Sequence, residues 1–544
     1  MAKVKLADYL FGRLKELGVD TTFGIPGDFV LPLYAAQERC GLKTIVMTHE
    51  PSVGFAADAY ARLRGLGVGL VTYGAGGLNM INSVALAYAE ESPLLIISGS
   101  PETRFRSQPA MLHHCVKEFD TQYNVFAEVT AAQALLDNPK TAQEQIELVL
   151  ETILKSSRPG YIEIPRDMVN TEIETQDRAP RSVEGESPAV LDAVGEIIQR
   201  LKASKRPVLL VGAEVSRFKL KDKIVELAEL LNIPVITSIL GKSSFPESNK
   251  NFIGNYFGRF GDTGVREYVE SADCILNIGA VLTEMETGGY TANLPPEKLI
   301  QIILRQATCG YKNYQGIDLK TFVESLLGQL KKEKNLPRFE LPQITKEEIK
   351  GSASSENLMV ADIIQQLNQF LTDDYVVASD VGDCLYAGLS LTTDTFIAPG
   401  YYSSMGFGVP AGIGAQIAQP EKRALVLVGD GAFQMTGLEM STAAKQGMNP
   451  IIIVFNNAIY GMLRFIDQQR EYYDLPKWDY AMLAKAVGGD GVVARTKEEF
   501  ADALKNAKRS NKIFLIDAQI PQSDISPTLT RLTDHFGAKV RASI

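Results

Sequence analysis

The fold is decided by the stretch RALVLVGDGAF (423–433) and by NPIIIVFNN (449–457), with the helical pattern TGLEMSTAAKQG (436–447) between them. The two apolar, β-branched runs are typical of buried strands. A strand, helix, strand unit has a right-handed crossover, so its two strands lie parallel. Asp430 and Asn457 follow these two strands directly. We therefore expect them at the same carboxyl edge of one sheet, where ligands bind in such folds.

The same alternation of short apolar runs and helical patterns extends over all 544 residues. A chain of this length divides into about three domains. Two polar, proline-bearing stretches separate the sets of strands: TQDRAPRSVEGESP (175–188) and KKEKNLPRFELPQITKEEIKGSASSEN (331–357). We predict an α/β fold of three doubly wound parallel-sheet domains: an N-terminal domain (1–175), a central domain (188–330) and a C-terminal domain (352–544).

Composition excludes several classes of function. The chain has 65 acidic and 55 basic residues and a formal charge of −10, which opposes binding to nucleic acid. With 45% apolar and 22% charged residues, it has the composition of a globular protein without membrane spans. Residues 1–18 read as an amphipathic helix without a signal-peptide core, so we expect a cytoplasmic protein. The five cysteines include no CxxC, so neither disulfides nor zinc are expected.

Asp430 and Asn457 together predict a metal site. A carboxylate, an amide oxygen and a backbone carbonyl just beyond them are hard oxygen ligands, which suit magnesium. The glycines on both sides of Asp430 let the backbone approach a diphosphate that the metal would bind. Taken alone, the Gly-Asp-Gly turn is more often a plain strand-end turn. The second motif 27 residues later favours the metal site instead.

Together, these two motifs resemble the signature of the thiamine diphosphate enzymes. The resemblance implies that magnesium is held by Asp430, Asn457 and the carbonyl of Ile459. The segment THEPSVGFAADAYAR (48–62) resembles the glutamate motif of the same enzymes. Glu50 would then protonate the aminopyrimidine ring of the cofactor, although an isolated strand-end glutamate is usually a solvated surface group. The remaining cofactor contacts that the resemblance implies are Asp383, Cys384, Ser403, Met405, Gly429, Gly431 and Ala432.

Two further motifs resemble those of the 2-oxo acid decarboxylases, a subgroup of these enzymes. These are the turn IPGDF (25–29), which contains Asp28, and the pair His113-His114. Histidines titrate near neutral pH and can move protons at working pH. Without the resemblance, one capping and one packing histidine would be an equally good reading. With it, Asp28, His113 and His114 are expected to act in proton transfer together with Glu50.

The similarity spans essentially the whole chain and resembles the bacterial phenylpyruvate and indolepyruvate decarboxylases most. Many pyruvate and indolepyruvate decarboxylases have a catalytic glutamate six residues after the metal-binding asparagine, where this chain has Leu463. Leucine can only pack, so the nearby acid Glu284 is a candidate source of the missing charge, although a surface loop acid is an equal alternative. Thr72 and Met462 are expected to line the substrate pocket with Leu463 and Glu284, although both could equally be ordinary core residues.

The expected reaction is non-oxidative decarboxylation of an aromatic 2-oxo acid, phenylpyruvate or indolepyruvate, to an aldehyde and carbon dioxide. The alternatives are a pyruvate or branched-chain 2-oxo acid decarboxylase, or a carboligase of the same superfamily. A flavin oxidase is disfavoured because VLLVGAEVSRF (208–218) contains no GxGxxG. The resemblance implies thiamine diphosphate and magnesium as cofactors. It also implies a homodimer at least and a homotetramer as the expected form, because two subunits build each site.

Overall fold

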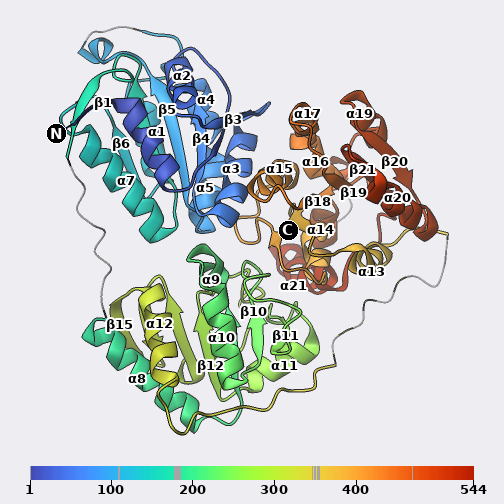
Figure 1. Ribbon diagram of the computed structural model, residues 1–544. Coiled ribbons are helices and arrows are strands. Elements are labelled where there is room, and N and C mark those ends of the chain that lie inside the picture. The colour runs from blue at the N-terminus through green and yellow to red at the C-terminus, as the bar shows by residue number, and fades with distance from the viewer. Residues whose placement is uncertain are drawn as a thin grey trace.

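The computed structural model describes residues 2–107, 111–176, 186–345, 347, 349, 351, 356–467 and 470–543. It contains three large β-sheets, each with helices packed on it, and these form three lobes (Figure 1). The three doubly wound domains predicted from the sequence are therefore present. Most of the predicted bridge between the first two domains lies outside the described residues.

The N-terminal domain is built on a six-stranded, wholly parallel sheet of order β3-β2-β4-β5-β7-β6. A separate antiparallel pair, β1 and β8, joins the two ends of the domain. Its elements are β1 (Ala2–Lys5), α1 (Leu6–Glu16), β2 (Thr21–Gly24), α2 (Leu31–Arg39), β3 (Lys43–Val46), α3 (Glu50–Arg64), β4 (Gly67–Val71), α4 (Ala75–Asn79), α5 (Ile81–Ala89), β5 (Leu94–Ser100), η1 (Thr103–Ser107), α6 (Thr121–Ala127), β6 (Ala132–Leu135), α7 (Ala142–Ser156), β7 (Gly160–Pro165) and β8 (Glu172–Thr175).

The central domain contains a seven-stranded sheet of order β11-β10-β9-β12-β13-β14-β15. Five strands are parallel, whereas β14 and β15 run antiparallel to their neighbours. Its elements are α8 (Pro188–Ala203), β9 (Pro207–Val211), α9 (Ala213–Arg217), α10 (Lys221–Leu231), β10 (Val235–Thr237), β11 (Phe252–Asn255), α11 (Thr263–Ser271), β12 (Cys274–Ile278), η2 (Pro296–Lys298), β13 (Leu299–Ile303), β14 (Arg305–Cys309), β15 (Lys312–Ile317) and α12 (Leu319–Leu330).

The C-terminal domain has a six-stranded parallel sheet of order β17-β16-β18-β19-β21-β20. The decisive stretch forms its centre, where β18 and β19 pair directly. Its elements are α13 (Val360–Phe370), β16 (Tyr375–Ser379), α14 (Asp383–Gly388), β17 (Phe396–Ile397), α15 (Gly408–Ala418), β18 (Arg423–Gly429), α16 (Asp430–Thr436), η3 (Gly437–Glu439), α17 (Met440–Lys445), β19 (Ile451–Asn456), α18 (Gly461–Ile466), η4 (Glu471–Tyr473), α19 (Tyr480–Ala486), β20 (Asp490–Ala494), α20 (Lys497–Arg509), β21 (Phe514–Gln519) and α21 (Pro527–Ser543).

Three details differ from the sequence-based expectation. The chain starts with a strand, β1, before the expected helix α1, because β8 lies alongside to pair with it. The central sheet is mixed because a tight turn at Gly310 (φ +63°) joins β14 to β15, so no crossover helix is needed. Glu50 is not at a strand end: β3 ends at Val46, and Glu50 begins α3.

Close backbone contacts hold the N-terminal and C-terminal domains together through α3 and α15. A Cβ atom at Gly414 of α15 would lie 2.0 Å from the carbonyl oxygen of Ala56 in α3, so glycine is required there. Another bridge between these domains is the buried carboxylate of Glu439, which accepts hydrogen bonds from Thr48 N (3.1 Å) and Thr48 Oγ1 (2.8 Å). The start of α3 is therefore fixed by the C-terminal domain.

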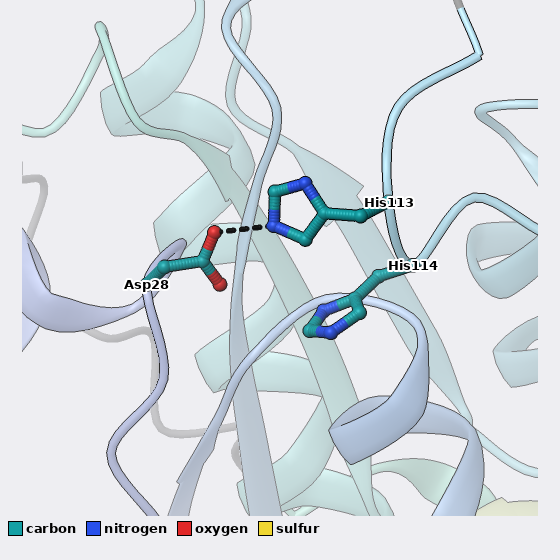
Figure 2. A group of neighbouring side chains, drawn as sticks. All are labelled: Asp28, His113 and His114. Atoms are coloured by element: carbon teal, nitrogen blue, oxygen red, sulfur yellow. Dashed lines mark hydrogen bonds and ion pairs between the residues drawn. The ribbon is translucent and has the colours of Figure 1, made fainter.

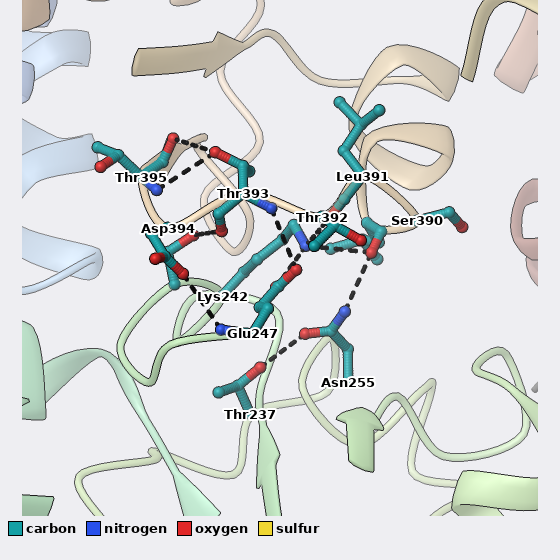
Figure 3. A network of polar contacts seen from close by, with 12 residues as sticks. Thr237, Lys242, Glu247, Asn255, Ser390, Leu391, Thr392, Thr393, Asp394 and Thr395 are labelled. Carbon is teal, nitrogen blue, oxygen red and sulfur yellow. Dashed lines mark hydrogen bonds and ion pairs between the residues drawn. The ribbon is translucent and has the colours of Figure 1, made fainter. Parts of the chain in front are cut away.

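A buried ion pair joins the central and C-terminal domains (Figure 3). Lys242 Nζ lies 2.6 Å from Glu247 Oε1 and donates to the carbonyls of Leu389 and Leu391 at 3.2 and 2.8 Å. Both charged side chains are less than 5% exposed, at 1% and 4%. Both buried charges are paired with each other, and Lys242 is also hydrogen-bonded to two carbonyls. The contact therefore fixes the orientation of the two domains and leaves no uncompensated charge in the interior.

No helix in the described part of the chain combines the length and the apolar character needed to cross a membrane.

Candidate active site

Asp28, His113 and His114 form one cluster on the N-terminal domain (Figure 2). Asp28 follows β2, whereas the histidines lie in a turn between η1 and α6. His113 Nε2 lies 2.6 Å from Asp28 Oδ2, and the two imidazole rings are 4.8 Å apart. The ring of Phe29 stacks on His113 at 4.9 Å. The cluster therefore combines one carboxylate with two imidazoles within reach of a common ligand.

The charges in this cluster favour an ionised aspartate. Burial alone would raise the pKa of Asp28, but the hydrogen bond and charge of His113 outweigh it, so the pKa lies below its ordinary value. The Asp28 side chain is 42% exposed and that of His113 is 61% exposed, so both can reach a ligand from this side of the domain. An ionised carboxylate hydrogen-bonded to an imidazole can accept the proton of that ring and pass it on.

A close backbone contact fixes His114. Its φ is +69°, a left-handed value that side chains rarely adopt, and a Cβ atom at Gly74 would lie 2.0 Å from its carbonyl oxygen. Nδ1 of His114 is buried and has no hydrogen-bond partner among the residues that the structure describes. A buried polar atom of this kind is expensive unless a ligand or water pairs with it. His114 therefore offers an available polar contact inside the cluster.

Glu50 is the first residue of α3 and lies near Thr72, which packs against the turn that contains Asp28. Its Oε2 accepts a hydrogen bond from Asn79 Nδ2 at 2.8 Å. Its Oε1 lies 3.6 Å from where a Cβ atom of Gly76 would be, and the methyl of Thr72 is 3.2 Å from that point. The Thr72 side chain also packs on Gly27, the neighbour of Asp28, and its buried Oγ1 has no hydrogen-bond partner in the described part of the chain. Thr72 thus lies between Glu50 and the Asp28 turn.

Asp430 and Asn457 lie together at the carboxyl ends of the paired strands β18 and β19. Asp430 is only 3% exposed, and its two oxygens accept hydrogen bonds from Gly431 N (2.8 Å) and Ala458 N (2.6 Å). Asn457 Oδ1 accepts from Ile459 N at 3.1 Å. Ala458 has a φ of +60°, so the chain turns back sharply over Asp430. The Asp430 carboxylate is therefore held against the turn that carries Asn457 and Ile459.

These donors suit a hard divalent cation. Burial raises the pKa of Asp430 to about 7, and no lysine or arginine of the described residues forms an ion pair with it. A buried carboxylate with backbone donors alone is destabilised when ionised, and a bound cation would relieve this. A Cβ atom at Gly429 would meet nothing within 4 Å, so there is space beside Asp430. The residues present fit magnesium and a diphosphate.

The other expected cofactor contacts lie around this turn. Gly431 and Ala432 follow Asp430 in the first turn of the helix α16 and are buried. Asp383 binds Ser526 through that residue's N–H (2.9 Å) and hydroxyl, so it anchors the start of the C-terminal helix, and burial raises its pKa to about 6. The thiol of Cys384 faces the carbonyls of Asp380 and Val381, which leaves only its backbone for a cofactor contact.

The loop before α15 carries Ser403 and Met405. Ser403 is exposed with a φ of +60°, and its hydroxyl donates to the carbonyl of Tyr401 at 3.3 Å. Met405 is half-buried and packs against the core that the N-terminal and C-terminal domains share. An unbranched thioether in this position can adapt its shape to a neighbouring ligand.

The expected substrate wall combines elements of two domains. Met462 of α18 and Met285 of the central domain pack on one apolar cluster with Leu529 and Leu532 of α21. Leu463 is 48% exposed, and Glu284, next to Met285, is exposed. The structure thus brings the Glu284 loop to the wall that α18 and α21 form, although no hydrogen bond joins Glu284 to α18 among the described residues.

The expected site residues therefore fall into two groups. One group surrounds Asp28, Glu50 and Thr72, and the other surrounds Asp430 and Asn457. No hydrogen bond or ion pair joins the two groups within the part of the chain that the structure describes. Sequence reasoning missed Asn79, which holds Glu50, because no local pattern links residues 29 positions apart. It also missed Phe29, although this residue belongs to the same IPGDF turn as Asp28.

Three family models match the chain in the order of its sheets. They are the thiamine pyrophosphate enzyme N-terminal TPP binding domain (residues 4–123), the central domain (194–330) and the C-terminal TPP binding domain (380–518). Thiamine pyrophosphate is thiamine diphosphate under its other name. The two outer models cover the two groups of site residues described above.

Characterised proteins match over nearly the full length. An indole-3-pyruvate decarboxylase of Azospirillum brasilense is 40% identical over 534 residues, 97% of each chain. A pyruvate decarboxylase of Aspergillus fumigatus is 30% identical over 98% of this chain and 97% of its own. An alpha-keto-acid decarboxylase of Mycolicibacterium paratuberculosis is 31% identical over 97% of this chain and 96% of its own. With three matching domains and this degree of identity, the chain belongs to the thiamine diphosphate-dependent 2-oxo acid decarboxylases, which are carboxy-lyases.

Proposed function

We propose that the chain decarboxylates aromatic 2-oxo acids, phenylpyruvate or indolepyruvate, to an aldehyde and carbon dioxide without oxidation. The observation that supports this most directly is the contact of His113 with Asp28 at 2.6 Å, with His114 beside them. An aldehyde-releasing decarboxylase must return a proton to the carbon that loses carbon dioxide, and this cluster is suited to that step. The name of the Azospirillum relative agrees with an aromatic substrate.

Each group of residues has a distinct task in this proposal. Asp430, Asn457 and the Ile459 carbonyl would hold magnesium, and Glu50 would hold the aminopyrimidine ring. The other contacts with the cofactor are assigned to Asp383, Cys384, Ser403, Met405, Gly429, Gly431 and Ala432. Thiamine diphosphate, when bound, supplies the electron sink that no side chain offers for the loss of carbon dioxide.

The proton work falls to the residues of the N-terminal domain. Glu50 would hold a proton on the ring nitrogen next to it, and Asn79 fixes the orientation of that carboxylate. Asp28 would take a proton from His113 across their hydrogen bond and, together with His114, pass it on as the aldehyde forms, while the same contact with His113 keeps Asp28 in place. His114 Nδ1, which is buried and unpaired within the described ranges, would bind the substrate or a water molecule.

The preference for a large, apolar substrate rests on the wall of α18. Leu463 and Met462 would provide an apolar surface for the substrate, and Thr72 of the N-terminal domain would line another side of the same pocket. Such a surface excludes water around a charged carboxylate, which favours a step that disperses the charge. Glu284, on the neighbouring loop, would supply the acid that Leu463 lacks. Pyruvate carries only a methyl group and would leave most of this apolar surface uncovered.

The assembly is part of the proposal. The two groups of site residues have no polar contact within one described chain, so we propose that a site forms between the N-terminal domain of one subunit and the C-terminal domain of another. The protein is then a homodimer at least, with a homotetramer as the expected form. A cytoplasmic location and the domain boundaries 1–175, 188–330 and 352–544 stay predictions.

A substrate assay tests the proposal directly. Phenylpyruvate, indolepyruvate and pyruvate are supplied in parallel, with and without thiamine diphosphate and magnesium, and aldehyde is measured by coupled alcohol dehydrogenase reduction. Cofactor-dependent aldehyde formation with the aryl substrates preferred is the expected result. A preference for pyruvate would overturn the assignment of the pocket. No aldehyde from any substrate would overturn the proposed function and direct attention to carboligation.

A further inference from the structure

Glu163 of β7 is one of the buried side chains that attach the segment with both active-site histidines to the sheet. Glu163 is fully buried, and its Oε1 accepts a hydrogen bond from Arg106 Nη2 at 2.9 Å. The other guanidinium nitrogen of Arg106, Nη1, pairs with Asp120. In sequence, His113 and His114 lie between Arg106 and Asp120. One guanidinium thus holds both sides of the histidine turn together and connects them to the core.

A second connection runs from the same carboxylate to the backbone that touches His114. Tyr161 OH donates to Glu163 Oε2 at 2.8 Å, and Gln122 Nε2 donates to Tyr161 OH at 2.6 Å. Gln122 Oε1 accepts from Gly74 N at 2.7 Å, and Gly74 is the residue packed against the His114 carbonyl. Gln122 and Tyr161 are both fully buried or nearly so, at 1% and 0% exposure.

From these contacts, we infer that Arg106 and Glu163 form a positioning pair, which sets the place of His113 and His114 relative to Asp28. Neither residue touches the reacting atoms; both act through the histidine turn. The inference deepens the proposed function and rests on its assignment of His113 and His114 to proton transfer.

The electrostatics explain why the pair depends on arginine. Burial raises the pKa of Glu163 to about 7, while the Tyr161 hydroxyl and the Arg106 charge both favour the ionised form. The Arg106 side chain is 19% exposed, that of Glu163 is 0% exposed, and that of Asp120 is 55% exposed. A planar guanidinium can span two carboxylates, whereas a lysine ammonium is a single point charge on a flexible stem. Lysine at this position would keep the contact with Glu163 but could not hold both acids in the same geometry.

The chain offers a matched control on the same short helix. Arg104, two residues before Arg106 in η1, pairs with Glu102 at 2.8 Å, but its side chain is 69% exposed. Arg104→Met removes the same charge and shape from the same helix without touching the core. The test compares this variant with Arg106→Met and Arg106→Lys in the full-length protein.

Two measurements are made on each variant. Steady-state kinetics with phenylpyruvate should give a kcat at least tenfold lower for R106M, with KM within twofold of wild type, because the histidines act after substrate binding. The kcat of R106K should lie between those of R106M and wild type, and the kcat of R104M should match wild type. Amide hydrogen–deuterium exchange on the cofactor-free protein should be faster in the peptide that contains His113 and His114 of R106M, with the peptides of β5 and β7 unchanged.

The outcomes separate this inference from the proposed function. Unchanged exchange in the histidine peptide of R106M overturns the inference whatever the activity, and so does a kcat within twofold of wild type or an equal loss in R104M. An inactive wild type overturns the proposed function, while the exchange result still decides the anchoring. If R106M does not fold, Asp120→Asn removes only the exposed contact. It should show a smaller change in the same direction, and no change in either measurement overturns the inference.

Discussion

Substitution of Gly74 by alanine should disable catalysis while the fold survives. Gly74 has a φ of +65°, and a Cβ atom there would lie 2.0 Å from the carbonyl oxygen of His114, whereas real Cβ atoms essentially never approach closer than 3.0 Å. His114 and Gly74 must therefore separate by about 1 Å. Its ψ of −95° puts Gly74 outside the left-handed helical region, in a conformation that only glycine adopts freely, so alanine adds backbone strain to the clash.

The displacement is the larger effect on activity. A misplacement of about 1 Å at a catalytic group can cost on the order of 10²-fold in rate. We therefore expect kcat for phenylpyruvate to fall on the order of 10²-fold in Gly74→Ala, with a loss of about 1–3 kcal/mol in stability from strain and clash together. The assay is aldehyde formation under saturating thiamine diphosphate and magnesium, next to thermal unfolding of the same samples.

Gly18 provides the matched control. It has a similar left-handed φ of +87°, but a Cβ atom there would meet nothing within 4 Å, and it lies at the end of α1. Gly18→Ala should show the backbone strain of about 1 kcal/mol and retain wild-type kcat. The reasoning is refuted if folded Gly74→Ala stays within twofold of wild-type kcat, or if Gly18→Ala loses as much activity.

Three further predictions concern single carboxylates. Glu50→Gln should lower kcat by about 10²–10⁴-fold, because the amide cannot share a proton. It should leave thermal stability nearly unchanged, because the amide oxygen can still accept from Asn79; retained turnover would contradict the assigned role. Asp430→Ala should abolish magnesium-dependent binding of thiamine diphosphate in a calorimetric titration, and an unchanged affinity would rule out the metal assignment. Glu286 is buried, and its pKa is raised to about 7. The folded state therefore keeps its proton at pH values where the unfolded chain has lost it, and its contribution to stability falls as the pH rises from about 4.5 to about 7. The Tm of wild type should thus fall more steeply over this window than that of Glu286→Gln, with Glu284→Gln, an exposed neighbour, behaving like wild type; parallel Tm curves would show that Glu286 does not titrate there.

Much of the fold follows from local patterns. The apolar runs that became β18 and β19 are buried along their length and pair in parallel, as the crossover rule requires. The strands β14 and β15 were not anticipated. Their sequences, RQATC and KNYQGI, are short and polar, because they form an edge hairpin that is partly exposed rather than a central strand covered on both faces.

Some residues of the site could likewise be placed from local sequence patterns, and others could not. Asp430 and Asn457 were expected at one sheet edge because each follows a strand, and the backbone N–H of Ala458 lies 2.6 Å from the Asp430 carboxylate. Glu50, by contrast, was expected at the end of a strand and in fact begins a helix. A helix start and a strand end are separated by only a few residues here, and the period of the apolar pattern does not resolve them.

The order of residues along the chain thus specifies the three α/β sheets and the motifs that identify a thiamine diphosphate enzyme, since both depend on neighbouring residues and on backbone geometry. The contacts between the side chains of these motifs and their partners, in contrast, form only when the helices, loops and sheets pack together. Asp28 meets His113 across 85 residues, Asn79 reaches Glu50 across 29, and Arg106 reaches Glu163 across 57. No periodicity links such positions, because their separation is set by how helices and loops pack against the sheet, which only the folded chain determines.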